Sequence, residues 1–349
     1  MKIDALKERL TSESIDAAVF ISEDFDPQVF YFTGYDGAGV LAIPKTGTPF
    51  LIAPPRDLDR AGKSGVEVLL RKGSVVDDLK EALTERKIHF SSLGVDSERI
   101  TMAKSLALRD LGVTLKDISP VLSGLRSIKY DMEVKLIRDA CKITDNIMSD
   151  VIDSWKDFQT EIDVASFIEM KAKKLGLPCP FHTIVASGKN ATDPHHRPTI
   201  QRLVDGPVVI DFGVCFRGYC SDITRTVCIG LPSDEVKKTY DMVRKTQDLA
   251  LSNVKPGIAC KDLDELARSS LGKLADRFIH GLGHGLGIEV HESPTINSRS
   301  QESLKKGNVI TIEPGLYTKD FGIRIEDDVL VTDDGYEVLT KSDRSLIIL

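Results

Sequence analysis

The chain of 349 residues lacks the features that mark membrane, secreted and nucleic-acid-binding proteins. No apolar run approaches the roughly 18 residues of a membrane span, and the N-terminal stretch MKIDALKERLTSES has no apolar signal core. The basic residues are dispersed and the formal net charge is −7, whereas phosphate binding requires a positive patch. We therefore expect a globular cytoplasmic protein that binds neither membranes nor nucleic acid.

Cysteine patterns that would indicate a thiol metal site or a disulfide framework are also missing. The chain has six cysteines, none of them in a CxxC pair, and six are few for a disulfide framework in a chain of this length. We expect these cysteines to be reduced and mostly buried. Cys215, Cys220 and Cys228 are expected to be packing residues.

The length exceeds that of one typical core, which predicts two domains. Residues 1–123 alternate short apolar runs with helical patterns, which is typical of an α/β domain. The expected strands cover 17–22, 39–44, 49–54 and 93–97, and the expected helices cover 4–10, 76–85 and 101–111. A break at Ser123–Gly124 separates this domain from residues 124–349.

The second domain shows one order of elements twice. Apolar periodicity predicts helices over 129–152 and 161–175, the latter with Thr160 as N-cap, and then a hairpin over 207–229 that turns at Phe216–Gly218. Helices over 234–253 and 261–275 follow, and then a hairpin over 309–332 that turns near Lys319–Asp320. This order predicts an α+β domain with an internal repeat at an offset of roughly a hundred residues.

Acidic residues flank both predicted turns. Asp211 and Asp222 flank the first turn almost symmetrically, so they would lie opposite each other, or within one residue of it, on one face of the hairpin. Glu313 and Glu326 flank the second turn in the same way. If the hairpins face each other, four like charges converge, and such a cluster must take up protons or bind cations. The sequence therefore predicts a site for two divalent ions.

The stretch HGLGHGLGIEVHE (280–292) would complete this site. Glycine weakens a strand unless something approaches the backbone closely, so we expect Gly283 and Gly285 to let His284 reach the metal ions as a nitrogen ligand. One nitrogen with several carboxylate oxygens is a fairly hard set, which suits Mn²⁺ or Co²⁺ better than a structural zinc, although Zn²⁺ also satisfies it. Two such ions lower the pKa of a shared water, which predicts hydrolysis of an acyl or phosphoryl bond.

Other interpretations apply to single residues. The glycine stretch begins a GxG, which is one feature of a phosphate-binding loop. It lacks the third glycine of the dinucleotide-binding fingerprint and leads into the strand-like segment GIEVH rather than into a helix, which argues against a phosphate-binding loop. Taken alone, His195 in the proline-flanked loop DPHHRPT is as readily a surface residue, and Arg324 is a counter-ion for the acidic residues. A single aspartate in a hairpin is usually solvated, so the matched spacing of four acids carries the metal hypothesis.

With these residues in place, the whole chain resembles the pita-bread metallopeptidases, the family that includes Xaa-Pro dipeptidase (prolidase) and aminopeptidase P. VVIDFG, CSDITRT, GLGHGLGIEVHE, TIEPGLY and GIRIEDDVLVT are similar to its metal and substrate motifs, in order. FHTIVASGKNATDPH resembles the segment with its substrate-side histidine, and FYFTGYDG and LRSIKYDMEVKLIRDA resemble its N-terminal and domain-joining signatures. The resemblance implies the following metal ligands: Asp211, Asp222, His284, Glu313 and Glu326.

The resemblance also implies a fold and a reaction. Residues 1–123 would form an α/β capping domain and residues 124–349 a pita-bread catalytic domain with a pseudo-twofold repeat. His195, the first of the doubled histidines, and His291 would contact the scissile group and the proline side of the substrate, and Arg324 its far end. The implied reaction is hydrolysis of the X–Pro bond through a metal-bridging hydroxide, with Glu313 moving protons, and the implied assembly is a homodimer.

Four related classes compete with a dipeptidase. Aminopeptidase P acts on longer peptides and shares the motifs, but the short N-terminal domain favours the dipeptidase. Methionine aminopeptidase shares the five ligands but lacks a domain like residues 1–122. Creatinase-like hydrolases have replaced the ligands, and some relatives are non-catalytic binding proteins. The intact set of five ligands argues against both of these last classes.

Overall fold

The computed structural model describes residues 2–349, which form two compact units. One unit ends at Arg126 and the other begins at Ser127, close to the break expected at Ser123–Gly124. No helix in this range is long and apolar enough to cross a membrane. The capping role expected for the first unit remains a prediction.

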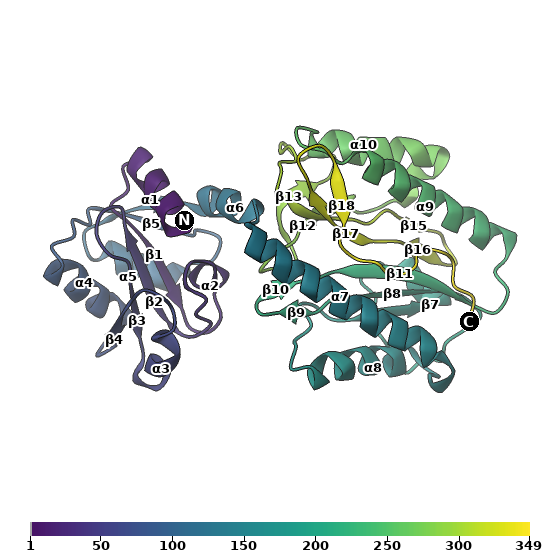
Figure 1. Cartoon of the computed structure of the whole chain (residues 1–349), viewed down its shortest axis with the longest axis horizontal. Coiled ribbons are helices and arrows are strands. Elements are labelled where there is room, and N and C mark those ends of the chain that lie inside the picture. Colours follow the sequence, from purple (N-terminus) through teal and green to yellow (C-terminus); the bar gives the residue numbers. More distant parts are fainter. Residues whose placement is uncertain (1) are drawn as a thin grey trace. The chain divides into compact units, whose positions relative to one another are not determined.

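The first unit is built on a mixed sheet with the strand order β4-β3-β2-β1-β5-β6 (Figure 1). Strand β1 pairs antiparallel with β2 and parallel with β5, so an antiparallel meander continues into parallel strands connected through helices. The strands are β1 (Ala17–Ser22), β2 (Gly39–Pro44), β3 (Phe50–Ala53), β4 (Glu67–Leu70), β5 (Ser92–Val95) and β6 (Thr114–Asp117). All four predicted strands are confirmed, and β4 and β6 are edge strands that sequence patterns missed.

Helices of the first unit follow local capping signals as well as periodicity. Helix α2 was not expected, yet Asp26 caps its N-terminus by accepting hydrogen bonds from the N–H groups of Gln28 and Val29, and Gly34 ends it with a φ of +69°. The helices of this part of the chain are α1 (Lys2–Ser12), α2 (Pro27–Thr33), α3 (Leu58–Ala61), α4 (Val75–Glu85), α5 (Met102–Arg109) and α6 (Ser119–Ser127).

A buried carboxylate ties the start of β1 to the start of β5. Asp16 accepts hydrogen bonds from Nζ of Lys45 at 2.8 Å, from Oγ of Ser91 at 3.0 Å and from the backbone N–H of Ser92 at 3.0 Å. Burial alone raises the pKa of Asp16, but these hydrogen bonds outweigh burial and lower that pKa far below its usual range. The charged form of Asp16 therefore stabilises the first unit.

We expect this contribution to appear as acid sensitivity. Because the pKa of Asp16 in the folded state lies below its unfolded value of about 3.9, the stabilisation is present above about pH 4 and is lost as the pH falls further. Asp16→Asn should lower the free energy of unfolding by about 1–3 kcal/mol at neutral pH and flatten its decline in acid. Urea denaturation at several pH values measures both effects.

The control variant Asp24→Asn removes an exposed carboxylate and should leave the pH dependence of the unfolding free energy unchanged. If the unfolding free energy of the Asp16 variant declined in acid as steeply as that of the wild type, the stabilising role of the Asp16 charge would be contradicted.

The second unit repeats one pattern: two helices, a strand and an antiparallel hairpin (Figure 1). The first copy consists of α7 (Asp131–Asp153), α8 (Glu161–Lys174), β7 (Ile184–Ser187), β8 (Gly206–Phe212) and β11 (Ile223–Ile229). The second copy consists of α9 (Asp234–Asn253), α10 (Cys260–Leu271), β12 (Gly283–Gly285), β14 (Val309–Ile312) and β17 (Asp327–Val331). The repeat predicted from the sequence is confirmed, and each copy also contains a strand between its helices and its hairpin.

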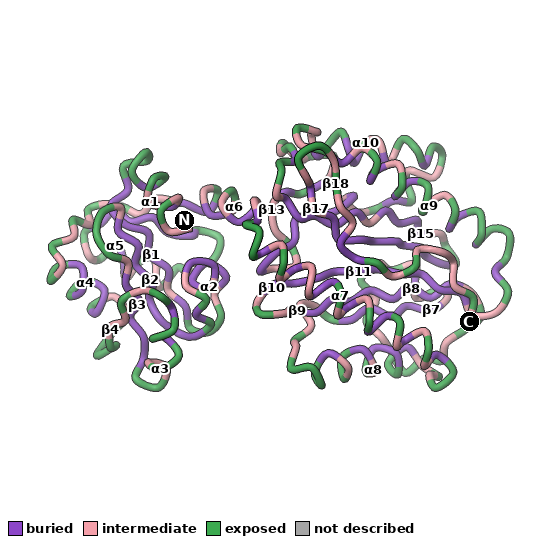
Figure 2. The backbone as a smooth tube through the Cα atoms, viewed as in Figure 1, coloured by how far each residue is buried: buried purple, intermediate pink, exposed green. Residues whose placement is uncertain are grey.

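Short strands extend both hairpins and the second sheet. They are β9 (Cys215–Phe216), β10 (Tyr219–Cys220), β13 (Glu292–Ile296), β15 (Gly315–Tyr317), β16 (Gly322–Arg324) and β18 (Tyr336–Val338). The two main sheets have the orders β11-β8-β7 and β13-β12-β14-β17-β18. Helices α7 and α8 pack on the first sheet, α9 and α10 pack on the second, and the strands between these helix pairs are largely buried (Figure 2).

Sequence patterns placed most of these elements correctly. Helix α8 has Thr160 as its N-cap, as predicted, and Gly176 follows its end with a φ of +75°. Two expectations were wrong. The segment GIEVH (287–291) is irregular rather than strand-like, because β12 ends at Gly285 and β13 begins only at Glu292. The helix expected over 261–275 ends at Leu271 and continues as a 3₁₀ turn, since Gly272 adopts a φ of +53°.

Candidate active site

The first hairpin presents Asp211 and Asp222 on one face. A two-residue turn at Arg217–Gly218 sets a register in which Asp211 lies opposite Thr224. Asp222 is therefore two residues away from the position opposite Asp211, and the prediction that the offset is at most one residue was wrong. Because side chains alternate with a period of two, an offset of two still directs both carboxylates to the same face.

The second hairpin places its two glutamates opposite each other. Ile312 pairs with Asp327, so the next residues, Glu313 and Glu326, face each other just beyond the ladder. The backbone N–H of Glu326 donates to the carbonyl oxygen of Thr224 at 3.1 Å, and Oγ1 of Thr224 donates to Oε2 of Glu326 at 2.6 Å. These contacts bring the two acidic hairpins together, as the repeat predicted.

The glycines around His284 serve a different purpose from the one expected. A Cβ on Gly283 would lie 2.0 Å from the carbonyl oxygen of Thr311, and one on Gly285 would lie 2.2 Å from that of Ser293. The missing side chains therefore let β12 pack closely between its neighbours β14 and β13. The reach of His284 toward metal ions remains a prediction, and what approaches these two glycines closely is the backbone of the neighbouring strands.

His284 is oriented so that one ring nitrogen faces the carboxylates. Its Nδ1 lies 3.0 Å from the carbonyl oxygen of Gly285, a contact that requires a proton on Nδ1. Nε2 then carries its lone pair and lies 3.4 Å from Oε1 of Glu313 and 3.8 Å from Oδ2 of Asp222. One ligand atom each from Asp222, His284 and Glu326 lies within 4.8 Å of the others. Burial lowers the pKa of His284 to about 4, so the ring is neutral at physiological pH.

The carboxylates are short of positive charge. Burial, together with repulsion from Glu326, raises the pKa of Asp222 well above its usual range, and burial raises the pKa of Glu313 to about 8 despite the neighbouring Arg324. Burial and repulsion from Glu313 likewise raise the pKa of Glu326. Oδ1 of Asp211 and Oδ1 of Asp222 are buried and find no hydrogen-bond partner within residues 2–349. Such oxygens around a neutral imidazole fit hard divalent cations.

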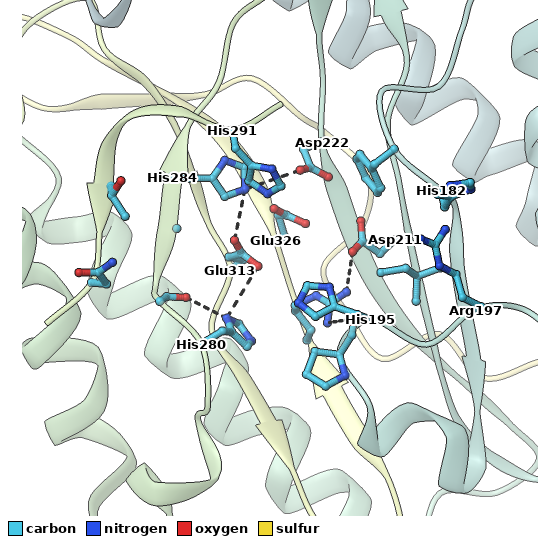
Figure 3. A pocket seen from close by; sticks show the side chains of 18 residues that line it. His182, His195, Arg197, Asp211, Asp222, His280, His284, His291, Glu313 and Glu326 are labelled. Carbon is cyan, nitrogen blue, oxygen red and sulfur yellow. Dashed lines mark hydrogen bonds and ion pairs between the residues drawn. The ribbon is translucent and has the colours of Figure 1, made fainter. Parts of the chain in front are cut away.

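All eight residues predicted for the site line one cavity of about 450 Å³ (Figure 3). His291 packs edge-on against His284, with ring centroids 4.3 Å apart. His195 lies on the side of the cavity near Asp211 (Figure 3). The predicted residues are His195, Asp211, Asp222, His284, His291, Glu313, Arg324 and Glu326.

Arg324 is buried at the base of the site and begins a hydrogen-bonded chain that sequence reasoning missed. Its guanidinium donates to Oδ2 of Asp211 at 2.5 Å and to the hydroxyl of Tyr317 at 2.7 Å. The Tyr317 hydroxyl lies 3.0 Å from Nε2 of His280, whose Nδ1 lies 2.8 Å from the carbonyl oxygen of Gly281. Burial and the positive charge of Arg324 lower the pKa of His280 to about 3, which keeps this ring neutral. The position of Tyr317, four residues after Glu313, was the available signal.

The doubled histidines have different surroundings. His195 lines the cavity, whereas Nε2 of His196 lies 2.9 Å from Oε2 of Glu161 outside it. The buried carboxylate of Glu161 also accepts hydrogen bonds from the backbone N–H of Ser187 at 2.8 Å and from the N–H and hydroxyl of Thr199. Glu161 thus fixes both ends of the segment that carries His195.

Two further buried residues that sequence reasoning did not assign hold the hairpins in place. Oδ2 of Asp328 accepts a hydrogen bond from the backbone N–H of Asp222 at 2.9 Å. Arg225 donates to the backbone carbonyl oxygen of Glu326 at 2.5 Å and to Oδ1 of Asp327 at 2.7 Å. Asp327 and Asp328 both belong to the motif GIRIEDDVLVT, but only the fold shows which partners they bind.

Sequence profiles of known families cover nearly the whole chain. Residues 135–333 match Metallopeptidase family M24, and residues 2–128 match the Creatinase/Prolidase N-terminal domain. The Xaa-Pro dipeptidase of Pyrococcus horikoshii is 34% identical over an alignment of 355 positions that covers 99% of this chain and 98% of that protein. An uncharacterized peptidase of Staphylococcus saprophyticus is 36% identical over 97% of this chain and 99% of its own length.

Solved structures show the same architecture over the full length. An Xaa-Pro dipeptidase from Bacillus anthracis superimposes with a TM-score of 0.93 and 32% identity, covering 100% of this chain and 99% of that one. An X-Pro aminopeptidase from Thermotoga maritima superimposes with a TM-score of 0.89 and 33% identity, covering 99% of this chain and 100% of that one. The fold is therefore shared with peptidases of both specificities.

Proposed function

The chain belongs to metallopeptidase family M24, and on that premise we propose that it is an Xaa-Pro dipeptidase, which hydrolyses the peptide bond before proline in dipeptides. The observation that supports this proposal most directly is the cavity lined by four carboxylates, the neutral imidazole of His284 and the buried guanidinium of Arg324. The name of the Pyrococcus horikoshii relative points to the same specificity. The similarity to an X-Pro aminopeptidase makes that activity the alternative.

In this proposal two divalent ions, Mn²⁺ or Co²⁺, are held by Asp211, Asp222, His284, Glu313 and Glu326. Four carboxylates would balance the four positive charges of such a pair, and the oxygen-rich set suits these ions. When bound, the ions polarise the scissile carbonyl and lower the pKa of a water molecule. The unpartnered Oδ1 atoms of Asp211 and Asp222 are the oxygens that such ions would satisfy.

The remaining steps belong to side chains of the cavity. Glu313 would accept a proton from the attacking water and deliver it to the leaving nitrogen, because its carboxylate lines the cavity beside Nε2 of His284. His195 and His291 would stabilise the charge that develops on the scissile group. Arg324 would orient the far end of the substrate through its fixed position next to Asp211 and Tyr317. The bond before proline lacks an N–H, so recognition would rest on the free amino terminus and the proline ring.

The proposal is tested by metal-dependent hydrolysis of a peptide panel. The purified protein is stripped with a chelator, reloaded with Mn²⁺, Co²⁺ or Zn²⁺, and given X–Pro dipeptides, X–Pro–Y tripeptides and dipeptides without proline. We expect metal-dependent release of proline from X–Pro dipeptides, with little cleavage of the others. Preferred cleavage of tripeptides would assign the X-Pro aminopeptidase activity instead. Failure to cleave any of these peptides with each metal would overturn the assignment as a peptidase of X–Pro bonds.

We also propose that the protein is a homodimer. Light scattering on the same sample tests this assembly.

The contacts of Glu161 predict a strong effect on catalysis from outside the cavity. Glu161→Gln converts one acceptor oxygen to a donor NH₂ group, so the carboxamide can accept the hydrogen bond of Ser187 or those of His196 and Thr199, but not both. We expect kcat/KM to fall by about tenfold to a hundredfold, because a small displacement of His195 disturbs substrate alignment. The content of bound metal, measured by atomic absorption, should stay unchanged.

The matched control for this prediction is Glu169→Gln. Glu169 lies on the same helix, α8, and its side chain is exposed, so this variant should behave as the wild type. If Glu161→Gln kept full activity, Glu161 would not position His195. If the Glu161→Gln variant lost bound metal along with activity, Glu161 would instead support the metal site.

A further inference from the structure

Two of the six cysteines face each other across the tip of the first hairpin. Strands β9 and β10 pair antiparallel with Cys215 opposite Cys220 and with Phe216 opposite Tyr219. The turn residues Arg217 and Gly218 have φ values of +50° and +82°, as tight two-residue hairpins require. The turn makes the two cysteines direct neighbours across the hairpin, although they do not form a CxxC motif in the sequence.

The backbone around this pair favours a covalent bond between the sulfurs. The N–H of Cys215 donates to the carbonyl oxygen of Pro178 at 2.9 Å, and the N–H of Cys220 donates to that of Gly287 at 2.7 Å. Since neither N–H bonds to the opposite cysteine, the pair occupies a non-hydrogen-bonded position, where Cα atoms approach to about 4.5 Å. That separation lies within the range that disulfides span. The two Sγ atoms are 2.7 Å apart.

The two thiols of the pair differ in their accessibility to solvent. Cys215 is partly exposed, whereas Cys220 is buried directly behind it with 1% of its surface exposed. Cys141, Cys228 and Cys260 are buried. Among the described cysteines only Cys179 shares the intermediate exposure of Cys215. An oxidant from solvent would therefore meet Cys215 first, with a second thiol already in contact.

We propose that Cys215 and Cys220 form an oxidative modification site, at which a peroxide or a low-molecular-weight disulfide converts the two thiols to an intrachain disulfide. With hydrogen peroxide, the sulfur of Cys215 takes one oxygen to give a sulfenic acid, and one water leaves. The sulfur of Cys220 then attacks the sulfenic sulfur, and a second water leaves with the thiol proton. In total one peroxide is reduced to two waters, and two thiols are oxidised to one disulfide.

The disulfide would close the hairpin between two residues of the candidate metal site. Cys215 follows Asp211 by four residues, and Cys220 precedes Asp222 by two. The link would restrain the turn that joins these two acids without removing either of them. Its formation does not depend on the peptidase activity, so the site can be tested whether or not the proposed function holds.

The test is peptide mapping of the folded, full-length protein after mild oxidation. The protein is treated with a small excess of hydrogen peroxide, quenched, alkylated under denaturing conditions and digested with trypsin. Because Arg217 lies between the two cysteines, trypsin separates LVDGPVVIDFGVCFR (203–217) from GYCSDITR (218–225). We expect these two peptides to appear joined, with two of six thiols protected from alkylation, and dithiothreitol should restore all six.

Three variants make the outcome decisive. Cys215→Ser and Cys220→Ser should each abolish the joined peptide, whereas Cys179→Ser, which removes the other partly exposed thiol, should leave it intact. Three results would overturn the proposal: six alkylated thiols after oxidation, a disulfide that contains Cys179, or Cys215 oxidised to a sulfinic acid without a crosslink. Thermal unfolding of each variant before oxidation establishes that the comparison is made on folded protein.

Discussion

Replacing Asp222 with asparagine is expected to abolish hydrolysis while leaving the fold at least as stable as before. Asp222 belongs to the cluster with His284 and Glu326 in which one ligand atom of each lies within 4.8 Å of the others. Metal ions supply several kcal/mol of transition-state stabilisation, and each 1.4 kcal/mol is a factor of ten in rate. We therefore expect kcat/KM on an X–Pro dipeptide to fall by about a thousandfold or more, with a loss of bound metal.

The same substitution should not weaken the folded chain. Burial and repulsion from Glu326 raise the pKa of Asp222, so its negative charge is unfavourable when no cation is bound. Oδ1 of Asp222 has no hydrogen-bond partner in the described part of the chain, and Asn has nearly the same shape. Urea denaturation in the presence of a chelator should show an unfolding free energy equal to or above that of the wild type.

An exposed acid on the second hairpin provides the control for this experiment. Asp320 lies on the turn and its side chain is 69% exposed, so Asp320→Asn should change neither activity nor stability. Wild-type activity in the Asp222 variant would remove Asp222 from the catalytic site. A large loss of stability would show instead that Asp222 has a structural role and that repulsion among the acids is unimportant.

Replacing Arg225 with methionine is expected to have the opposite effect, a large loss of stability. Arg225 and Asp327 form an ion pair at 2.7 Å, with side-chain exposures of 3% and 1%. The guanidinium also donates to four backbone carbonyl oxygens, those of Thr224, Glu326, Ser342 and Asp343. Without Arg225, the only ion-pair partner of Asp327 within residues 2–349 is Arg344, at 3.9 Å. Removal of one partner of a buried pair typically costs about 3–5 kcal/mol. We expect the free energy of unfolding to fall by about that amount.

The variant Arg225→Lys tests whether the stability depends on the positive charge of Arg225 or on the geometry of its hydrogen bonds. A lysine retains the positive charge but lacks the planar fork that donates to several acceptors at once, so we expect an intermediate loss of stability. Arg299→Met, at an exposed arginine, is the matched control and should leave the urea midpoint unchanged. A midpoint for Arg225→Met equal to that of this control would contradict the structural role.

The two substitutions are expected to distinguish a residue that serves catalysis, Asp222, from a residue that serves folding, Arg225. Asp222 contributes an unfavourable buried charge that a bound cation or a proton relieves, whereas Arg225 relieves the charge of Asp327 permanently. Acidic clusters and buried arginines are expected to differ in this way, because a protein tolerates local strain at a functional site and compensates for it elsewhere.

Local sequence determined the elements and the chemistry of the candidate site. Apolar periodicity predicted the four helices and the two hairpins of the second unit, because burial of one face imposes a period of 3.6 or 2 on the chain. The acids that flank each turn converge as expected, since hairpin partners must share a face. The position of His284 beside them also agrees with the expectation, although its glycine neighbours serve strand packing.

Only the tertiary structure decided which neighbours these residues have. The register of the first hairpin depends on a turn at Arg217–Gly218. The choice between His195 and His196 depends on Glu161, more than thirty residues earlier in the chain. The contact between Glu161 and His196 joins residues distant in sequence, so no local period encodes it. The register of the hairpin likewise depends on which residues occupy the turn, and the period of two along each strand does not specify this.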